Sequence, residues 1–410
     1  MAQLSSVADL IMGQSPPSTT YNEVGAGLPF FQGKSDFGFL HPKPRLFCDA
    51  PAKIAQPKDI LMSVRAPVGP TNIADRKCCI GRGLAAIRPR TIDADFLFFN
   101  LRYLESSIAA LGGGSTFHAI NKNQLASVEV NERKFDIPEQ RRIAAVLGLA
   151  RAAIEQQEEL LALTTELKKA LLNKLFTRGL RDESQKQTEF GPMPRSWKIV
   201  SLGSVMSEEP KNGLYKHSSH YGGGTLILRI DDFSNEGDIV TSASNRLKVD
   251  AHERALYRLR KDDIVFNRVN SLSHLGKTAI IGDLVETMVF ESNMMRFRAD
   301  DEKVLPHYVF RWMNSPFCKR QIIGCAKRAV AQSSINQGNL KAVLMPLPPL
   351  SEQGDIASHL DCIDRKLAVS RRKRAALSAL FRTLLHELIT AQIRLNDVEV
   401  DLAFAKPEME

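Results

Sequence analysis

The feature that most constrains the fold of this chain is a helical sequence that occurs twice. Residues 138–154 read PEQRRIAAVLGLARAAI, and residues 351–367 read SEQGDIASHLDCIDRKL. Glu-Gln opens both segments, and apolar residues then recur in one common register for about ten helical turns. A register kept over this length indicates a duplication, so the chain is predicted to consist of two related halves.

The apolar residues of both segments follow a heptad spacing, which is typical of a helix that buries one stripe against another helix. The expected stripes are Ile143, Val146, Leu147, Ala150, Ala153, Ile154, Leu160, Leu161, Leu167, Leu171 and Leu175 in the first helix, and Ile356, Leu360, Ile363, Leu367, Leu377, Leu380, Phe381, Leu384, Leu385 and Leu388 in the second. Gln157 and Ser370 interrupt the stripes at equivalent positions, where they could fix the register or form a hydrated part of the seam. Each helix would be about 60 Å long, and the simplest burial packs one against the other.

The similarity extends to the segments that precede the helices. The matched pairs are residues 58–75 with 262–283, 93–104 with 304–314, and 117–130 with 332–345. Runs with a period of two, such as LILRIDDF, DIVFNRV and NMMRFRAD, predict strands in these segments. We therefore expect a mixed α+β fold, with two similar globular domains separated by two long helices that pack as an antiparallel coiled coil with pseudo-twofold symmetry.

The expected boundaries follow from the repeat and from changes in composition. They are a first globular domain at 1–135, a central long helix at 136–181, a second globular domain at 182–348 that begins with a polar linker at 182–196, a C-terminal long helix at 349–395, and a flexible acidic tail at 396–410.

Composition sets broad limits on function. Of the 410 residues 43% are hydrophobic and 25% are charged, which is typical of globular domains. An apolar run of about 18 residues and a secretory signal are both missing, so a cytoplasmic location is expected. The net charge of +9 is compatible with a polyanionic partner. Six scattered cysteines without a Cys-x-x-Cys pair predict reduced, mostly buried thiols and argue against a zinc site.

Catalytic motifs are weak in this chain. The stretch LGKTAI at 275–280 resembles a phosphate-binding loop, but Ser271 stands where that loop needs a glycine. The first half has Pro70 at the place of Lys277, so a tight turn between strands fits both copies better. We predict no catalytic residues and no metal ligands.

Basic, amide and aromatic residues recur outside the helices of both halves, which favours DNA binding, because such side chains contact phosphates and base edges. The predicted DNA-binding residues are Gln14, Tyr21, Gln32, Lys34, Arg65, Lys77 and Arg82 in the first half, and Lys211, Tyr215, Lys216, Arg229, Asn267, Arg268, Lys277, Lys327 and Arg328 in the second.

The layout resembles the specificity subunits of type I restriction-modification systems. The resemblance covers nearly the whole chain and depends on LPPLSEQGDIASHLDCIDRKL, on its copy DIPEQRRIAAVLGLARAAI, and on GQSPPSTTYNEVGAGLPFFQGKSDF at 13–37. It implies that each globular domain is a target recognition domain for one half of a bipartite DNA sequence, and that the helices set the length of the unread spacer.

The resemblance also implies partners. The chain would lack catalysis and would bind double-stranded DNA together with two modification subunits and with restriction subunits that act as translocases. S-adenosylmethionine, ATP and magnesium are then expected on those partner subunits, and no cofactor is expected on this chain. Two alternatives remain open at this point: a solitary DNA-modifying enzyme or ATPase with an unrecognised site, and a coiled-coil scaffold.

Overall fold

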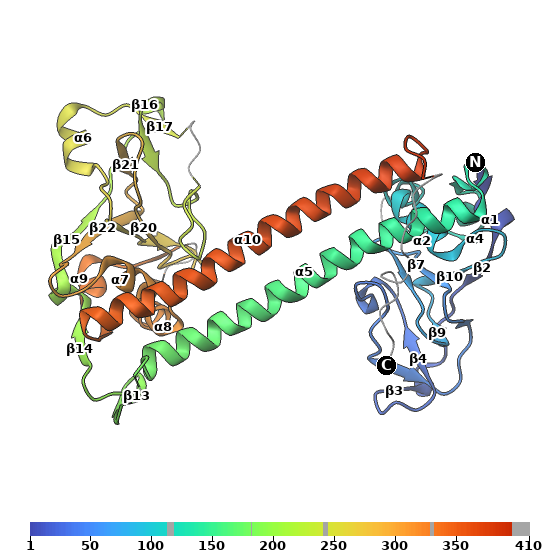
Figure 1. Cartoon of the computed structure of the whole chain (residues 1–410), viewed down its shortest axis with the longest axis horizontal. Coiled ribbons are helices and arrows are strands. Elements are labelled where there is room, and N and C mark those ends of the chain that lie inside the picture. Colours follow the sequence, from blue (N-terminus) through green and yellow to red (C-terminus); the bar gives the residue numbers. More distant parts are fainter. Residues whose placement is uncertain (113–118, 182, 241–244, 329–331, 396–410) are drawn as a thin grey trace. The chain divides into compact units, whose positions relative to one another are not determined.

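Two long helices lie at the repeated sequences: α5 (Ile137–Thr177) and α10 (Leu350–Ile389). The computed structural model describes residues 1–112, 119–181, 183–240, 245–328 and 332–395 (Figure 1). The chain divides into a first unit, Met1–Leu161 with Ser370–Glu410, and a second unit, Ala162–Val369. Each long helix contributes one part to each unit. The tail predicted at 396–410 lies outside the described residues, and the expected pseudo-twofold relation of the halves stays a prediction.

The first unit contains a four-stranded antiparallel sheet. Its strands, in spatial order, are β2 (Ala8–Met12), β10 (Leu84–Pro89), β7 (Ile60–Ser63) and β8 (Thr71–Ile73). A second sheet has the order β3 (Tyr21–Asn22), β5 (Leu46–Cys48), β4 (Leu28–Phe31), β9 (Cys78–Ile80) and β6 (Ile54–Ala55), in which β4 and β9 run parallel. β1 (Ala2–Gln3) pairs with β11 (Glu129–Val130).

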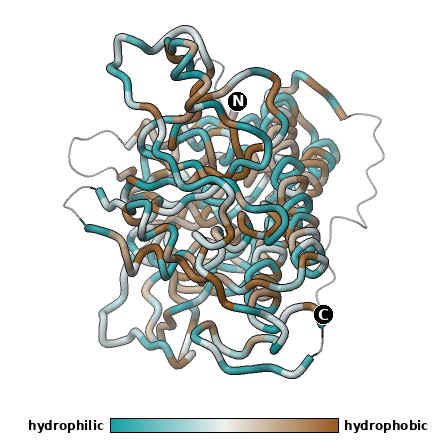
Figure 2. Tube along the Cα trace, turned by 90° about the vertical axis from the view of Figure 1, so that its left-hand side faces the viewer, coloured by the Kyte–Doolittle hydropathy of each residue, from teal (hydrophilic) through white to brown (hydrophobic). Residues whose placement is uncertain are grey.

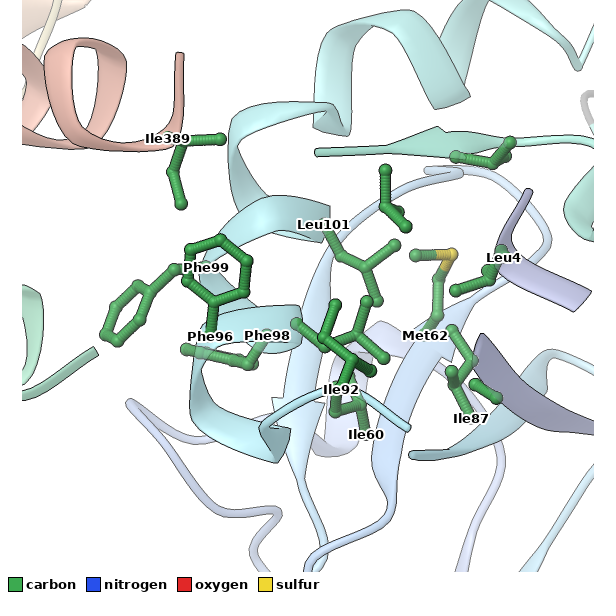
Figure 3. Packing of buried hydrophobic residues seen from close by; sticks show 14 of the residues in the cluster. Leu4, Ile60, Met62, Ile87, Ile92, Phe96, Phe98, Phe99, Leu101 and Ile389 are labelled. Carbon is green, nitrogen blue, oxygen red and sulfur yellow. The ribbon is translucent and has the colours of Figure 1, made fainter. Parts of the chain in front are cut away.

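The four-stranded sheet of the first unit is buried on both faces, which explains its nearly continuous apolar strands. On one face, Ile60, Met62 and Ile87 belong to the same core cluster as the aromatic side chains of helix α2 (Ala94–Tyr103), and Figure 3 shows Leu101 between the two groups. On the other face, apolar side chains such as Leu61 form a separate cluster. The end of α10 belongs to the first core, because Ile389 is fully buried there.

The second unit repeats this architecture. Its four-stranded antiparallel sheet has the order β15 (Met206–Asn212), β22 (Met294–Ala299), β18 (Ile264–Asn267) and β20 (Thr278–Ile280). A further sheet has the order β17 (Arg246–Leu247), β16 (Tyr221–Leu228) and β21 (Met288–Phe290), and β16 and β21 run parallel as β4 and β9 do. The four-stranded sheets therefore match in strand order and sense, and in the second sheets the part β5-β4-β9 matches β17-β16-β21.

The repeat is also visible in individual backbone conformations. Lys58 and Asp262, which the sequence match aligns, have positive φ angles of 71° and 67°. The Lys58 amide donates to the carbonyl of Ala74 at 2.8 Å, and the Asp262 amide donates to that of Ile281 at the same distance. The predicted match of residues 58–75 with 262–283 is thus confirmed, and Gly69 and Gly276 have positive φ in both copies. The tight turn expected between the strands is wrong, because the longer loops 64–70 and 268–277 connect them.

The repeated Glu-Gln pair has a structural role. Gln140 accepts a hydrogen bond from the amide of Asp93 at 2.9 Å, and Gln353 accepts one from the amide of Leu305 at 2.8 Å. Each glutamine also donates to a carbonyl five residues earlier, and both glutamines are buried. Each glutamine therefore holds the start of its long helix against the start of another helix, which is α2 for Gln140 and α7 (Pro306–Met313) for Gln353.

The long helices pack antiparallel in each unit. The contacts that show this are Glu139 with Arg394 and Glu158 with Arg374 in the first unit, and Lys168 with Asp364 and Leu180 with Glu352 in the second. In both units the residue number rises along α5 as it falls along α10. The predicted packing of the two helices is confirmed.

The middle of the helical seam differs from the prediction. Leu160, Leu167 and Leu380, which were placed in the apolar stripe, are 39%, 57% and 50% exposed. Gln157 and Ser370 are buried, so the polar residues belong to the seam itself. The hydropathy colouring alternates along the helical coils, as expected for helices with one buried side (Figure 2).

Two further predictions need correction. The run LILRIDDF was predicted as one strand, but β16 ends at Leu228 and a turn follows, in which the Asp232 side chain accepts from the Arg229 amide. The predicted linker at 182–196 contains a hairpin formed by β12 (Gln185–Thr188) and β13 (Gly191–Pro194). Trp197 directly after it is fully buried, so this segment contributes to the core of the second unit.

The cysteines lead to a first testable prediction. All six are free, and Cys362 on α10 is the exposed one. Burial raises the pKa of Cys78 to about 12 and that of Cys79 to about 11, so these thiols stay protonated near neutral pH. With Ellman's reagent at about pH 8, we expect one fast-reacting thiol, which Cys362→Ser should remove. Several fast thiols in the native protein would contradict the packing described here.

Candidate nucleic-acid interface

In the first unit, several strand ends meet at the turn between β9 and β10. The backbone hydrogen bonds that bring them together are Gly13 N to Leu84 O (2.8 Å), Gln14 N to Ile80 O (3.0 Å), Gly81 N to Phe31 O (2.8 Å) and Val64 N to Gly83 O (2.9 Å). The approach requires glycine at position 83, because a Cβ atom there would lie 2.2 Å from the carbonyl oxygen of Gln32. The ends of β2, β4 and β7 are therefore fixed against one turn.

Four predicted residues follow these strand ends, and we call them the first strand-end cluster: Gln14, Gln32, Arg65 and Arg82. All four side chains are exposed. The Arg82 amide donates to the hydroxyl of Ser15 at 3.4 Å, which connects the turn to the end of β2. Amide and guanidinium groups on a rigid backbone are the groups that recognise base edges in the major groove of DNA.

The second unit contains the same backbone frame. Its hydrogen bonds are Gly213 N to Met294 O (3.1 Å), Leu214 N to Phe290 O (2.8 Å), Glu291 N to Leu228 O (3.1 Å) and Arg268 N to Asn293 O (2.9 Å). Each bond corresponds to one bond of the first unit. Gln32 and Arg229, which follow the ends of β4 and β16, therefore occupy equivalent positions.

The second strand-end cluster consists of Tyr215, Arg229, Arg268 and Glu291. Tyr215 is 81% exposed, and Arg268 donates to the Ser292 carbonyl at 3.3 Å. The buried Glu291 carboxylate accepts from the Ile230 amide at 2.6 Å and lies 3.7 Å from the Arg229 Nε. Burial raises the pKa of Glu291.

Lys327 and Arg328 extend this edge of the second unit. They form the short strand β23 (Lys327–Arg328), which pairs with β24 (Ser333–Ser334). β24 pairs in turn with β19 (Val269–Asn270), which directly follows Arg268. Both side chains are exposed on this small sheet, and Arg268 directly precedes its strand β19.

Three predicted residues of the first unit lie outside its strand-end cluster. Lys34 is exposed and follows Gln32 by two residues. Tyr21 packs on Phe30 with ring centroids 4.7 Å apart, and its hydroxyl donates to the Pro16 carbonyl. Lys77 is exposed, but it precedes β9 and so lies at the opposite end of that strand from the turn.

Lys211 and Lys216 have partners within the second unit. The Lys211 ammonium lies over the ring of Tyr257, 5.3 Å from its centroid. Lys216 forms an ion pair with Glu253 at 2.6 Å, and that contact lowers the pKa of Glu253. Surface ion pairs of this kind can be exchanged for contacts with DNA phosphates at small cost.

Two of the predicted DNA-binding residues are buried in the second unit. Asn267 in β18 is fully buried. Lys277 is 6% exposed, and its ammonium donates to the carbonyls of Ile230 at 2.7 Å and Phe233 at 2.9 Å. Burial lowers the pKa of this lysine. Lys277 of LGKTAI therefore holds the loop at residues 230–233 in place by hydrogen bonds. We do not include Lys277 or Asn267 in the proposed interface.

This role of Lys277 can be tested by stability. Lys277→Met should lower the free energy of unfolding by about 1–3 kcal/mol, because two buried carbonyls lose their donor. The matched change Lys34→Met, at an exposed site, should alter it by less than about 0.5 kcal/mol. Chemical denaturation of both variants gives the comparison, and equal stabilities would show that Lys277 is not a structural lysine.

Sequence reasoning missed the carboxylates that support these clusters. The backbone amide of Gln32 donates to the Asp36 carboxylate at 2.7 Å, and the backbone amide of Arg229 donates to the Asp232 carboxylate at 2.8 Å. Glu291 was missed as well. Aligning the turn sequence IGRGL with FESNM would have placed Gly81 opposite Glu291, but these turns share no residue that draws attention to them.

The described part of the chain contains no group of three or more His, Cys, Asp or Glu side chains placed to hold a metal ion. Among the helices described, none is both long and apolar enough to cross a membrane.

Comparison with known proteins identifies the family. The sequence model of the type I restriction modification DNA specificity domain matches residues 2–165 and 194–379. The chain belongs to this family, whose members recognise DNA sequence as specificity subunits of type I restriction-modification systems. The two matched segments agree with the repeat found in the sequence and in the strand order.

Individual relatives support the assignment. The chain is 43% identical to the type I restriction enzyme MjaX specificity subunit of Methanocaldococcus jannaschii over 174 residues, which are 42% of this chain and 40% of that protein. It is 25% identical to the MjaVIII specificity subunit of the same organism over 316 residues, 75% of this chain and 72% of the relative. The fold is similar to that of an S subunit from M. genitalium, with a TM-score of 0.64, 16% identity and 95% of each chain covered.

Proposed function

We propose that this chain reads a bipartite DNA sequence for a type I restriction-modification complex. The first strand-end cluster would contact one half of the target, and the second strand-end cluster would contact the other half. The target recognition domains would be residues 1–135 and 182–348, which are the segments expected from the sequence.

One observation carries the proposal: the same backbone frame presents different side chains in the two units. Gln32 and Arg82 of the first unit correspond to Arg229 and Ser292 of the second, as the paired hydrogen bonds show. The counterpart of Gln14 is the buried Leu214, so the second unit has no polar side chain at that position. A shared frame with different hydrogen-bonding groups is what two related readers of different sequences require, because base identity is read by the pattern of donors and acceptors.

The helices are proposed to set the spacer between the half-sites. α5 and α10 have 41 and 40 residues, and each continues from one unit into the other without a break. Their antiparallel packing within both units supports a stiff connection. Half-sites about one turn of DNA apart, roughly 34 Å, would suit helices of this length.

The partners belong to the proposal as well. We infer that the chain has no catalysis of its own and binds two modification subunits, which would carry S-adenosylmethionine, and restriction subunits, which would use ATP and magnesium. Contacts to DNA would come from both clusters together with Lys34, Lys327 and Arg328, and more weakly from Tyr21, Lys77, Lys211 and Lys216. The cytoplasmic location expected from the sequence stays a prediction.

Selection from a library of random duplexes tests the proposed function. The purified full-length chain should enrich one motif made of two short sequences around an unread gap. Its affinity should fall steeply with salt concentration, because phosphate contacts release counterions. Enrichment of a continuous motif would argue against two separate readers. Failure to enrich any sequence would favour a scaffold without a role in DNA recognition.

A further inference from the structure

The equivalent positions of Gln32 and Arg229 differ in their surroundings. In the first unit the neighbouring turn residue is Gly81, which has no side chain. In the second unit that residue is Glu291, and its carboxylate lies 3.7 Å from the Arg229 guanidinium. The turn of the second unit therefore supplies a carboxylate beside Arg229, and the turn of the first unit supplies none beside Gln32.

Arg229 is held on two sides. Its guanidinium carbon lies 5.8 Å from the centre of the Tyr221 ring, and its Nε faces Glu291. Its backbone amide donates to the Asp232 carboxylate at 2.8 Å. The side chain nevertheless remains 45% exposed. An arginine held by a ring and a carboxylate keeps its remaining N–H groups directed at a partner, with less loss of side-chain entropy on binding.

The local charge distinguishes a base contact from a phosphate contact. Glu291 lies beside Asp231 and Asp232, whose charges act on it together with that of Arg229. These carboxylates reduce the positive potential that a phosphate contact depends on. A bidentate pair of hydrogen bonds from the guanidinium to the O6 and N7 atoms of guanine depends on geometry, so the neighbouring carboxylates do not weaken it.

We propose that Arg229 reads a guanine in the half-site bound by the second unit and that Glu291 positions its guanidinium. Gln32 reads an adenine at the equivalent place in the other half-site, since an amide can pair with the N6 and N7 atoms of adenine. This assignment rests on the proposed function and adds to it the identity of one base in each half-site.

The test compares the motifs selected by the full-length chain and by three variants from a library of random duplex DNA. Arg229→Gln places the side chain of the first unit in the second frame. It should reduce the preference for one guanine about ten- to hundredfold and shift that position toward adenine, leaving the other half of the motif unchanged. Glu291→Gln keeps an acceptor for the Ile230 amide and should weaken the same guanine preference by several fold without changing the thermal stability.

Arg246→Gln is the matched control. Arg246 forms an ion pair with Glu286 at 2.7 Å on the same sheet, but Glu286 precedes β21 and Glu291 follows it, so the pair lies away from the cluster. The motif of Arg246→Gln should equal that of the wild-type chain, which excludes a general effect of removing an arginine from the sheet.

The possible outcomes are distinct. If the wild-type chain selects a gapped motif and Arg229→Gln selects the same motif, the assignment of Arg229 is wrong while the proposed function stands. A uniform loss of affinity for all sequences in Arg229→Gln would identify a phosphate contact and also overturn it. If the wild-type chain selects no gapped motif, both the proposed function and the base assignment fail.

Discussion

Replacing Phe176 by alanine is expected to lower the free energy of unfolding of the second unit by about 3–5 kcal/mol. Phe176 lies near the end of α5 and is fully buried. Its ring meets Tyr308 and Trp312 edge to face, with centroids 5.7 and 5.2 Å away. The substitution would leave a cavity, because the surrounding aromatic rings cannot close the space. It would also weaken the packing of α5 in the core of the second unit.

Tryptophan fluorescence measures this effect selectively. The chain has two tryptophans, Trp197 and Trp312, and both are fully buried in the second unit. Denaturation followed by fluorescence therefore reports on that unit. Leu167→Ala is the matched control on the same helix, because Leu167 is 57% exposed and should change the stability by less than about 0.5 kcal/mol. Similar losses in both variants would mean that α5 does not pack as described.

Glu352→Ala is expected to have the second largest effect, a loss of about 2–4 kcal/mol. The Glu352 carboxylate is 2% exposed and accepts from the indole N–H of Trp197 at 3.1 Å and from the Leu180 amide at 3.0 Å. Its removal leaves two donors without an acceptor in the core. The same fluorescence measurement detects the change, because Trp197 is one of the two reporters.

The repeat supplies the control for this variant. Glu139 is the counterpart of Glu352, but it lies in the first unit and pairs with Arg394 at 2.6 Å. Glu139→Ala should leave the tryptophan-detected transition nearly unchanged. An unchanged transition in Glu352→Ala would contradict the buried hydrogen bonds, and an equal shift in both variants would show that the units do not unfold separately.

The sequence predicted the long helices and the duplication well, because both depend on local and periodic signals. An apolar stripe kept over ten turns and a repeated Glu-Gln pair leave few alternatives. The role of the pair was not predictable, since Gln140 and Gln353 act on Asp93 and Leu305, which are 47 and 48 residues away in the chain.

The middle of the seam was predicted less well. Leu160 and Leu167 look like core residues by hydropathy, but the register set by the rest of α5 leaves them 39% and 57% exposed. Thr164 is buried instead, and Lys168 pairs with Asp364 at 2.5 Å. A hydropathy pattern cannot show that polar groups will find partners on another helix, and such groups can fix the register of a coiled coil.

The candidate site was predicted only in outline. Residue type identified Gln32 and Arg229 as possible DNA contacts, and the structure places them at equivalent strand ends. Residue type also suggested Lys277, which proved to be buried. Whether a cation faces solvent or a carbonyl depends on loops distant in sequence, as does the approach of Glu291 to Arg229, so a single sequence could not separate these cases.

Mapping methylated bases in the genomes of cells that contain or lack this chain tests the central claim most directly. The account predicts one methylated motif, made of two short sequences around a gap of fixed length, which is present only with the chain. A continuous motif, or methylation that is the same in both kinds of cell, would contradict the claim that two related readers on packed helices define the target.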